Sequence, residues 1–231
     1  MKKINLPTKI TISRIIIGGL LIVALIICYL LDQFNVINVA SFNFECGRTT
    51  LNSLMLIFLA VFLIASLTDF LDGYLARKNN QITDLGKFLD PIADKMLINA
   101  VMVFLAINFI STQEALKFPW FCVVLMIIRD LVVDGLRFMA ATKNVVLAAN
   151  YWGKAKTVLQ MIAISLVFLN GWPFSYFDAN WSIYLHVTDI ICYLTTLTSL
   201  IGGVIYLKDN KKVFYEKWKF FDKFSKFPTY Y

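Results

Sequence analysis

The chain alternates long apolar runs with short polar segments along most of its 231 residues. A transmembrane helix needs about 20 consecutive, mostly apolar residues to cross the bilayer core, and several runs approach that length. Hydrophobic residues make up 59% of the sequence and charged residues only 16%, which differs strongly from a soluble domain. We therefore expect an all-α polytopic membrane protein, a bundle of about six transmembrane helices. The expected spans are roughly 12–31, 51–71, 92–110, 119–141, 154–176 and 182–206.

One domain is expected over residues 1–207, because no internal repeat and no Gly/Ser-rich linker divides this part of the sequence. The composition changes only in the tail, residues 208–231, where lysines alternate with aromatic residues. Phe214, Trp218 and Phe221 recur there at helical spacing. This pattern predicts an amphipathic helix on the surface of an anionic membrane, and binding to nucleic acid is not expected.

The distribution of basic residues predicts the orientation of the chain in the membrane. Of the 22 lysines and arginines, only Arg48 and Lys117 fall on one side of the six expected spans. Basic residues accumulate on the cytoplasmic side of membrane proteins. We therefore expect a multi-pass protein of the cell membrane with both termini in the cytoplasm.

Four aspartates lie near the expected cytoplasmic ends of the second and third spans: Asp69, Asp72, Asp90 and Asp94. On helices, residues three or four apart share a face, so each pair of carboxylates points in one direction. Two antiparallel helices joined by a short loop bring the pairs together in one acidic pocket. Ionised carboxylates at a membrane boundary need compensating cations. Because neither His nor Cys is nearby, two Mg²⁺ or Mn²⁺ ions are the expected partners.

Other residues beside these aspartates favour a phosphate-containing substrate. Gly73 and Gly86 remove side-chain bulk where a phosphate or ribose could approach the backbone, and Arg77 adds a fixed positive charge. A pair of divalent ions can hold the oxygens of a diphosphate and stabilise the leaving group during in-line displacement. The alternative from a different class is a cation or proton transporter, for which charges near the membrane midplane and two matching halves are expected.

This arrangement resembles the signature of the CDP-alcohol phosphotransferase family, Asp-x-x-Asp-Gly-x-x-Ala-Arg, eight residues, then Gly-x-x-x-Asp-x-x-x-Asp. The matching residues are Asp69, Asp72, Gly73, Ala76, Arg77, Gly86, Asp90 and Asp94. The resemblance implies about six transmembrane helices, two bound divalent ions and a homodimer. It also implies an active site at the cytoplasmic side that transfers a substituted phosphoryl group from a CDP-linked donor to an alcohol and releases CMP.

The resemblance also implies roles for individual residues. Asp69, Asp72 and Asp90 are the expected metal ligands, and Asp94 is expected both to bind metal and to take the proton from the acceptor hydroxyl. The residues expected to contact the CDP part of the donor come from two segments. Four belong to the family signature, Gly73, Ala76, Arg77 and Gly86, and Thr11 belongs to the N-terminal Pro-x-x-Ile-Thr-x-x-Arg segment.

A second group of charges lies at the expected cytoplasmic junction of the fourth and fifth spans. These cations are Arg129, Arg137, Lys154 and Lys156. Arg129 falls within an apolar run, so it needs a polar partner. We interpret the four cations as a binding site for the phosphate of the acceptor.

The segments around these cations resemble those of bacterial family members that use sn-glycerol 3-phosphate as the acceptor. Three positions depart from that pattern: Thr8 replaces asparagine, Asp130 replaces glutamate and Asp134 replaces threonine. Asp134 either pairs with a cation or weakens phosphate binding. The expected reaction is transfer of the phosphatidyl group of CDP-diacylglycerol to sn-glycerol 3-phosphate. The alternative acceptors are phosphatidylglycerol, which gives cardiolipin, and an inositol phosphate.

Overall fold

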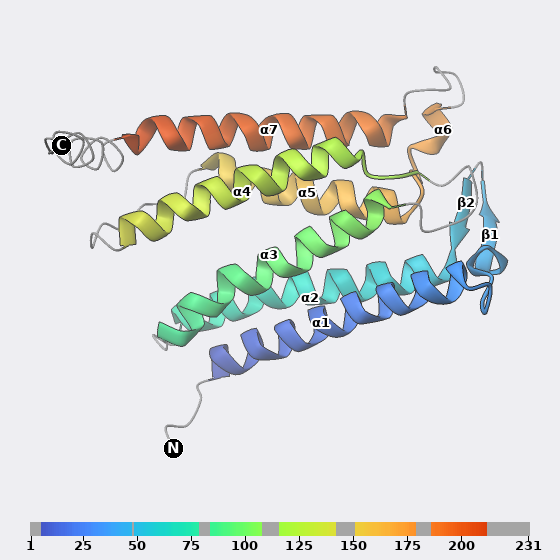
Figure 1. Cartoon of the computed structure of the whole chain (residues 1–231), viewed down its shortest axis with the longest axis horizontal. Coiled ribbons are helices and arrows are strands. Elements are labelled where there is room, and N and C mark those ends of the chain that lie inside the picture. Colours follow the sequence, from blue (N-terminus) through green and yellow to red (C-terminus); the bar gives the residue numbers. More distant parts are fainter. Residues whose placement is uncertain are drawn as a thin grey trace, which may run out of the picture.

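The computed structural model is a bundle of long helices (Figure 1), and it describes residues 6–47, 49–78, 84–107, 116–141, 151–178 and 186–211. Side chains are described throughout these ranges except at 6–10, 69–78, 84–91, 94 and 177–178. The long helices are α1 (Leu6–Gln33), α2 (Ser53–Lys78), α3 (Asp84–Ala106), α4 (Trp120–Ala141), α5 (Tyr151–Phe168) and α7 (Val187–Asp209). The short elements are a 3₁₀ helix η1 (Val39–Phe42), strands β1 (Asn43–Cys46) and β2 (Thr49–Asn52), and helix α6 (Ser175–Asp178).

Each apolar run expected from the sequence corresponds to one long helix, which confirms the all-α bundle. Two helical segments, Thr11–Gln33 and Val187–Asp209, are both long and apolar enough to cross a membrane by length and composition. Ser53–Thr68 and Lys95–Ala106 are shorter apolar segments. The number of spans and the side on which the termini lie remain predictions.

The long helices run roughly along one direction, so their ends gather at two ends of the bundle. Figure 1 shows the start of α1, the end of α2, the start of α3, the end of α4, the start of α5 and the end of α7 at the same end. The strands and α6 lie at the opposite end. The helix ends expected to carry the aspartates and the basic residues therefore share one end of the molecule. Of the predicted tail, residues 212–231 lie outside the described residues.

A small antiparallel hairpin, which the sequence analysis did not predict, covers the other end. Strands β1 and β2 pair with Asn43 opposite Asn52. The amide of Asn52 donates to the Val39 carbonyl at 2.9 Å, while its side-chain oxygen accepts from the Leu54 backbone N–H at 3.0 Å. Asn52 thus ends the hairpin and caps the first turn of α2, since a helix start leaves backbone N–H groups without partners in the helix.

Helix α5 ends earlier than the sequence analysis expected, at Phe168 and not near residue 176. Asn170 (φ 47°) and Gly171 (φ 80°) follow in the left-handed region, and the Gly171 N–H donates to the Leu166 carbonyl at 2.9 Å. This geometry stops a helix, and glycine adopts it at low cost. The apolar residues beyond Gly171 therefore belong to a turn and to α6, so helix α5 is shorter than the expected run.

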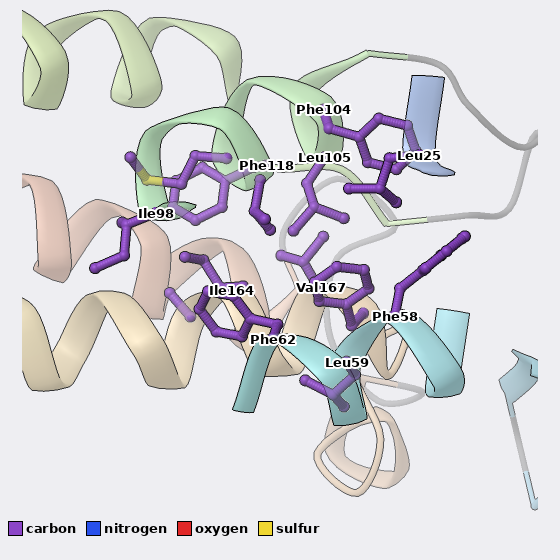
Figure 2. Close-up of a cluster of buried hydrophobic side chains, with 14 of the residues drawn as sticks. Leu25, Phe58, Leu59, Phe62, Ile98, Phe104, Leu105, Phe118, Ile164 and Val167 are labelled. Atoms are coloured by element: carbon purple, nitrogen blue, oxygen red, sulfur yellow. The ribbon is translucent and has the colours of Figure 1, made fainter. Parts of the chain in front are cut away.

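Buried side chains from α1, α2, α3 and α5 converge in the hydrophobic core shown in Figure 2. Phe62 of α2, Val101 and Met102 of α3 and Ile164 of α5 are fully buried. Leu97 and Ile98 of α3 belong to the same core. Because Lys95 and Asn99 are on the same stretch of α3, this packing fixes the part of α3 that borders the site described below.

Candidate functional site

The predicted aspartates all lie in helical backbone. Helix α2 carries Asp69 and Asp72, and α3 carries Asp90 and Asp94. Residues 79–83 between the two helices lie outside the described residues. Helical spacing places each pair of aspartates within about one turn. The side chains of all four lie outside the described part, so their convergence on a metal site remains a prediction.

The predicted donor-binding residues fall into two groups. Gly73, Ala76 and Arg77 are in the last turns of α2, and Gly86 is in the first turn of α3, again in helical backbone whose side chains are not described. Thr11 is different because its side chain is described. It is 2% exposed on α1, which packs against both α2 and α3. Thr11 thus lies on a helix that contacts the two aspartate-bearing helices.

The four predicted acceptor-site cations line one cavity of about 230 Å³ between α3, α4, α5 and α7. Helix α4 contributes most of the charged groups, α5 two lysines, and α3 a lysine and an asparagine. The polar and charged lining residues are Lys95, Asn99, Arg129, Asp130, Asp134, Arg137, Lys154, Lys156, Thr157, Gln160 and Tyr206. Among these described residues five basic side chains face two acidic ones, so the cavity has an excess of positive charge.

Asp130 organises the innermost cations of the cavity. The Lys156 ammonium donates to both Asp130 carboxylate oxygens, at 2.6 and 2.5 Å, and Arg129 Nη1 donates to Asp130 Oδ1 at 3.0 Å. The side chains of Lys156 and Asp130 are each only 7% exposed. A charge this deeply buried requires a charged partner, and here each side chain supplies one for the other. Asp130 therefore fixes two of the predicted cations in place.

Arg129 has a further partner on α7, which confirms the expectation that it needs polar contacts. Its Nε donates to the Ser199 carbonyl at 2.9 Å. Gly203, one turn further along α7, provides the space for this side chain. A Cβ atom at Gly203 would lie 2.9 Å from Arg129 Cγ and 3.2 Å from Nε. The absence of a side chain at Gly203 thus allows the guanidinium to lie between α4 and α7.

Replacing Gly203 by alanine is expected to displace Arg129 and to lower stability by about 1 to 3 kcal/mol, the usual cost of inserting an extra methyl group into a packed interior. Thermal unfolding of the purified protein in detergent measures this loss. Gly19→Ala on α1 is the matched control, because a Cβ atom there meets no described atom within 4 Å. If both variants unfold at the wild-type temperature, Gly203 does not set the position of Arg129.

Arg137 and Lys154 are the more accessible cations of the cavity. Arg137 Nε donates to the Tyr206 hydroxyl at 3.4 Å, and its guanidinium carbon lies 5.5 Å from the centre of the Tyr206 ring. This contact orients the arginine toward α7. Lys154 is exposed at the start of α5. Both can bind an incoming ligand without first leaving a carboxylate that the described residues supply.

Lys95 was not among the residues predicted for this cavity, which it also lines. The Lys95 ammonium forms an ion pair with the Asp134 carboxylate, so α3 and α4 are joined across the cavity wall. Asp134 was expected either to pair with a cation or to weaken phosphate binding, and the pair with Lys95 shows the first. The signal in the sequence was the position of Lys95 directly after Asp94, but the partner helix could not be identified from spacing alone.

A second cavity, of about 440 Å³, adjoins the first and is mainly apolar. Ile92 and Met96 of α3 and Phe138 of α4 form its apolar wall. It shares Lys95, Asn99, Asp134 and Arg137 with the charged cavity. The two spaces together present charged groups beside an apolar groove, an arrangement that suits a molecule with a polar head and an apolar tail.

Comparisons with known proteins agree with the sequence motif. The family described as CDP-alcohol phosphatidyltransferase matches residues 4–201. A relative from Bacillus subtilis (strain 168) is 34% identical over 209 residues, which cover 89% of this chain and 95% of the relative. One from Mycoplasma pneumoniae is 36% identical over 215 residues, 90% of this chain and 88% of the relative. One from Rickettsia felis is 34% identical over 211 residues, 91% of this chain and 97% of the relative. All three are named CDP-diacylglycerol--glycerol-3-phosphate 3-phosphatidyltransferase.

Proposed function

The chain belongs to the CDP-alcohol phosphatidyltransferase family, and we propose that it transfers the phosphatidyl group of CDP-diacylglycerol to sn-glycerol 3-phosphate, giving phosphatidylglycerophosphate and CMP. The relatives that cover most of its length are named for these two substrates. The observation that carries the proposal is the charged cavity, which borders the helix that bears Asp90 and Asp94. It offers a phosphate site next to the predicted reaction centre.

The charge and the polar groups of the cavity suit a phosphate monoester with hydroxyl groups. Arg137 and Lys154 can bind phosphate oxygens with charge-assisted hydrogen bonds, while Arg129 and Lys156 keep the inner wall positive. The side-chain oxygen of Asn99 is buried and has no hydrogen-bond partner among the described residues. An acceptor hydroxyl could donate to it. These features support glycerol 3-phosphate over an uncharged alcohol.

The residues predicted to hold metal suit two hard divalent cations. Four carboxylates, with no cysteine or histidine between them in the sequence, are the ligand type that Mg²⁺ and Mn²⁺ prefer. Helical backbone at all four positions is consistent with two pairs of carboxylates on facing helices. Asp69, Asp72, Asp90 and Asp94 are the proposed ligands. Bound there, the ions would neutralise the donor diphosphate and favour departure of CMP.

The chain's own groups carry out the remaining chemistry in this proposal. Asp94 accepts the proton of the acceptor hydroxyl, whose oxygen then bonds to the β-phosphorus of the donor. The bond from that phosphorus to the CMP oxygen breaks as the new one forms. Arg77 balances phosphate charge, and the backbone at Gly73 and Gly86 permits close approach of the CDP part. Ala76 and Thr11 complete the proposed contacts to the donor.

The proposed setting is the cell membrane, with six spans, both termini and the active site on the cytoplasmic side. The two long apolar segments and the abundance of exposed apolar side chains on the long helices support a membrane location. The acyl chains of the donor can then remain in the bilayer while its polar part enters the site from the side. Residues 208–231 form the proposed surface tail, and the family resemblance further suggests a homodimer.

Removal of an accessible cation is expected to weaken acceptor binding selectively. Arg137→Ala or Lys154→Ala should raise the apparent KM for glycerol 3-phosphate, because each charge-assisted contact is worth about 1.5 to 3 kcal/mol, or roughly 10- to 150-fold. The KM for CDP-diacylglycerol should change little. Steady-state kinetics with each substrate varied in turn measure both constants.

Lys208→Ala is the control for this experiment, since Lys208 is exposed at the end of α7 and lines neither of the described cavities. It should leave both constants near their wild-type values. Equal losses for donor and acceptor in the Arg137 and Lys154 variants, or a wild-type preference for an acceptor without phosphate, would overturn the assignment of glycerol 3-phosphate.

A further inference from the structure

The ion pair between Lys95 and Asp134 differs from the pair between Lys156 and Asp130 in the same charged cavity. Lys156 and Asp130 are each 7% exposed and are further fixed by Arg129. Lys95 and Asp134 are 29% and 21% exposed. Partly exposed pairs are screened and contribute little to stability, whereas a deeply buried charge is costly to separate from its partner. Lys95 is therefore a pocket cation that can exchange its carboxylate for another anion.

Lys95 also lines the cavity proposed to hold the acceptor phosphate. It directly follows the proposed base Asp94 on α3, and it lines the same cavity as Arg137 and Lys154. Glycerol 3-phosphate is a small molecule, so its phosphate and its reacting hydroxyl are only a few bonds apart. Because Lys95 shares the cavity of the other proposed phosphate ligands and lies within the same turn of α3 as the proposed base, it can bind the phosphate while the hydroxyl reaches Asp94.

We propose that Lys95 is a further ligand of the acceptor phosphate and that Asp134 is its counter-ion, which competes with the phosphate and so sets the affinity for the acceptor. This inference rests on the proposed function. When the phosphate enters, the ammonium transfers its hydrogen bonds from the Asp134 carboxylate to phosphate oxygens. Asp134 lowers the affinity for the acceptor because its ion pair with Lys95 must be broken before the phosphate can bind. Asp134 therefore acts on the acceptor only by way of Lys95.

The competition has a second consequence for selectivity. An acceptor with a phosphate monoester carries enough negative charge to replace a carboxylate on Lys95, while an uncharged alcohol cannot. While Lys95 is paired with Asp134, an uncharged alcohol gains no binding energy from the charge of Lys95. The Lys95–Asp134 pair therefore favours phosphorylated acceptors, at the expense of some affinity for them.

A set of three variants tests the proposal by steady-state kinetics in the full-length protein. Lys95→Met should raise the KM for glycerol 3-phosphate about 10-fold or more, and Asp134→Asn should lower it about 3-fold or more. In the double variant the Asp134 change should have less than about a 2-fold effect, because its partner is gone. The KM for CDP-diacylglycerol should stay near the wild-type value throughout.

Lys95→Arg, which keeps the charge, should retain most of the acceptor affinity, and Lys208→Met is the control for loss of a lysine outside the cavities. A purely structural pair predicts a different result: both single variants lose thermal stability and turnover together, the double variant recovers, and the KM for the acceptor does not move. That result would overturn the proposal. An unchanged or raised KM for the acceptor in Asp134→Asn would also overturn it. The Asp134→Asn variant keeps the proposal testable even if Lys95→Met does not fold. Failure of wild-type protein to use glycerol 3-phosphate would instead refute the proposed function.

Discussion

Removal of divalent cations is expected to abolish phosphatidyl transfer completely, and addition of Mg²⁺ or Mn²⁺ is expected to restore it. The four aspartates of α2 and α3 that are the proposed metal ligands place several negative charges where the negatively charged diphosphate of the donor is proposed to bind. Without cations, like charges repel the donor, and departure of CMP has no electrostatic support. Release of CMP from CDP-diacylglycerol, measured in excess EDTA and after back-titration with each metal, gives the answer.

A variant links this result to a specific residue. Asp69→Asn removes one charged oxygen ligand with little change in volume, so a higher metal concentration should be needed for half-maximal activity. Lys208→Ala, in the last turn of α7, should titrate like the wild type. Full turnover in excess EDTA would refute metal dependence, and an unchanged titration for Asp69→Asn would assign that residue a structural role.

Replacement of Asp94 by asparagine is expected to reduce turnover by about 10² to 10⁴, the usual contribution of general base catalysis. Asparagine keeps the shape of the side chain and cannot accept the proton. Binding of CDP-diacylglycerol should survive better than in Asp69→Asn, because in this assignment proton removal is the main role of Asp94. The two variants should therefore lose different properties. Asp94→Asn should lose turnover, and Asp69→Asn should lose metal binding and donor binding.

Turnover and donor binding of both variants, measured on protein of equal thermal stability, separate these roles. Near-wild-type turnover in Asp94→Asn would mean that another group takes the proton. Equal losses of donor binding in both variants would mean that Asp94 acts mainly as a metal ligand.

The helices were predictable from the sequence because hydrophobic run length is a local property. Each apolar run became one long helix, and the segments that carry Asp69 and Asp94 are helical as expected. The errors came from local geometry that periodicity does not report. Helix α5 ends where Asn170 and Gly171 adopt positive φ, and the hairpin of β1 and β2 depends on backbone pairing between short segments with no strong alternating pattern.

The charged cavity was predictable only in part. The positions of Arg129 and Lys156 suggested one site because both lie at the same expected membrane boundary, and both do line one cavity. The sequence could not identify Lys95 as a member, because that depends on how α3 packs against α4. It also could not show that Asp130 holds two of the cations. Their roles in binding the acceptor remain predictions, as does the geometry of the metal site.

The most direct test of the central proposal is identification of the lipid formed by the purified full-length protein. The protein is incubated in lipid vesicles or detergent with CDP-diacylglycerol, Mg²⁺ or Mn²⁺, and equal concentrations of glycerol 3-phosphate, phosphatidylglycerol and an inositol phosphate. We expect phosphatidylglycerophosphate as the main lipid product, formed in equal amount to CMP. Cardiolipin or an inositol-containing lipid as the main product would contradict the assigned acceptor, and the absence of any new lipid formed together with CMP would contradict phosphatidyl transfer itself.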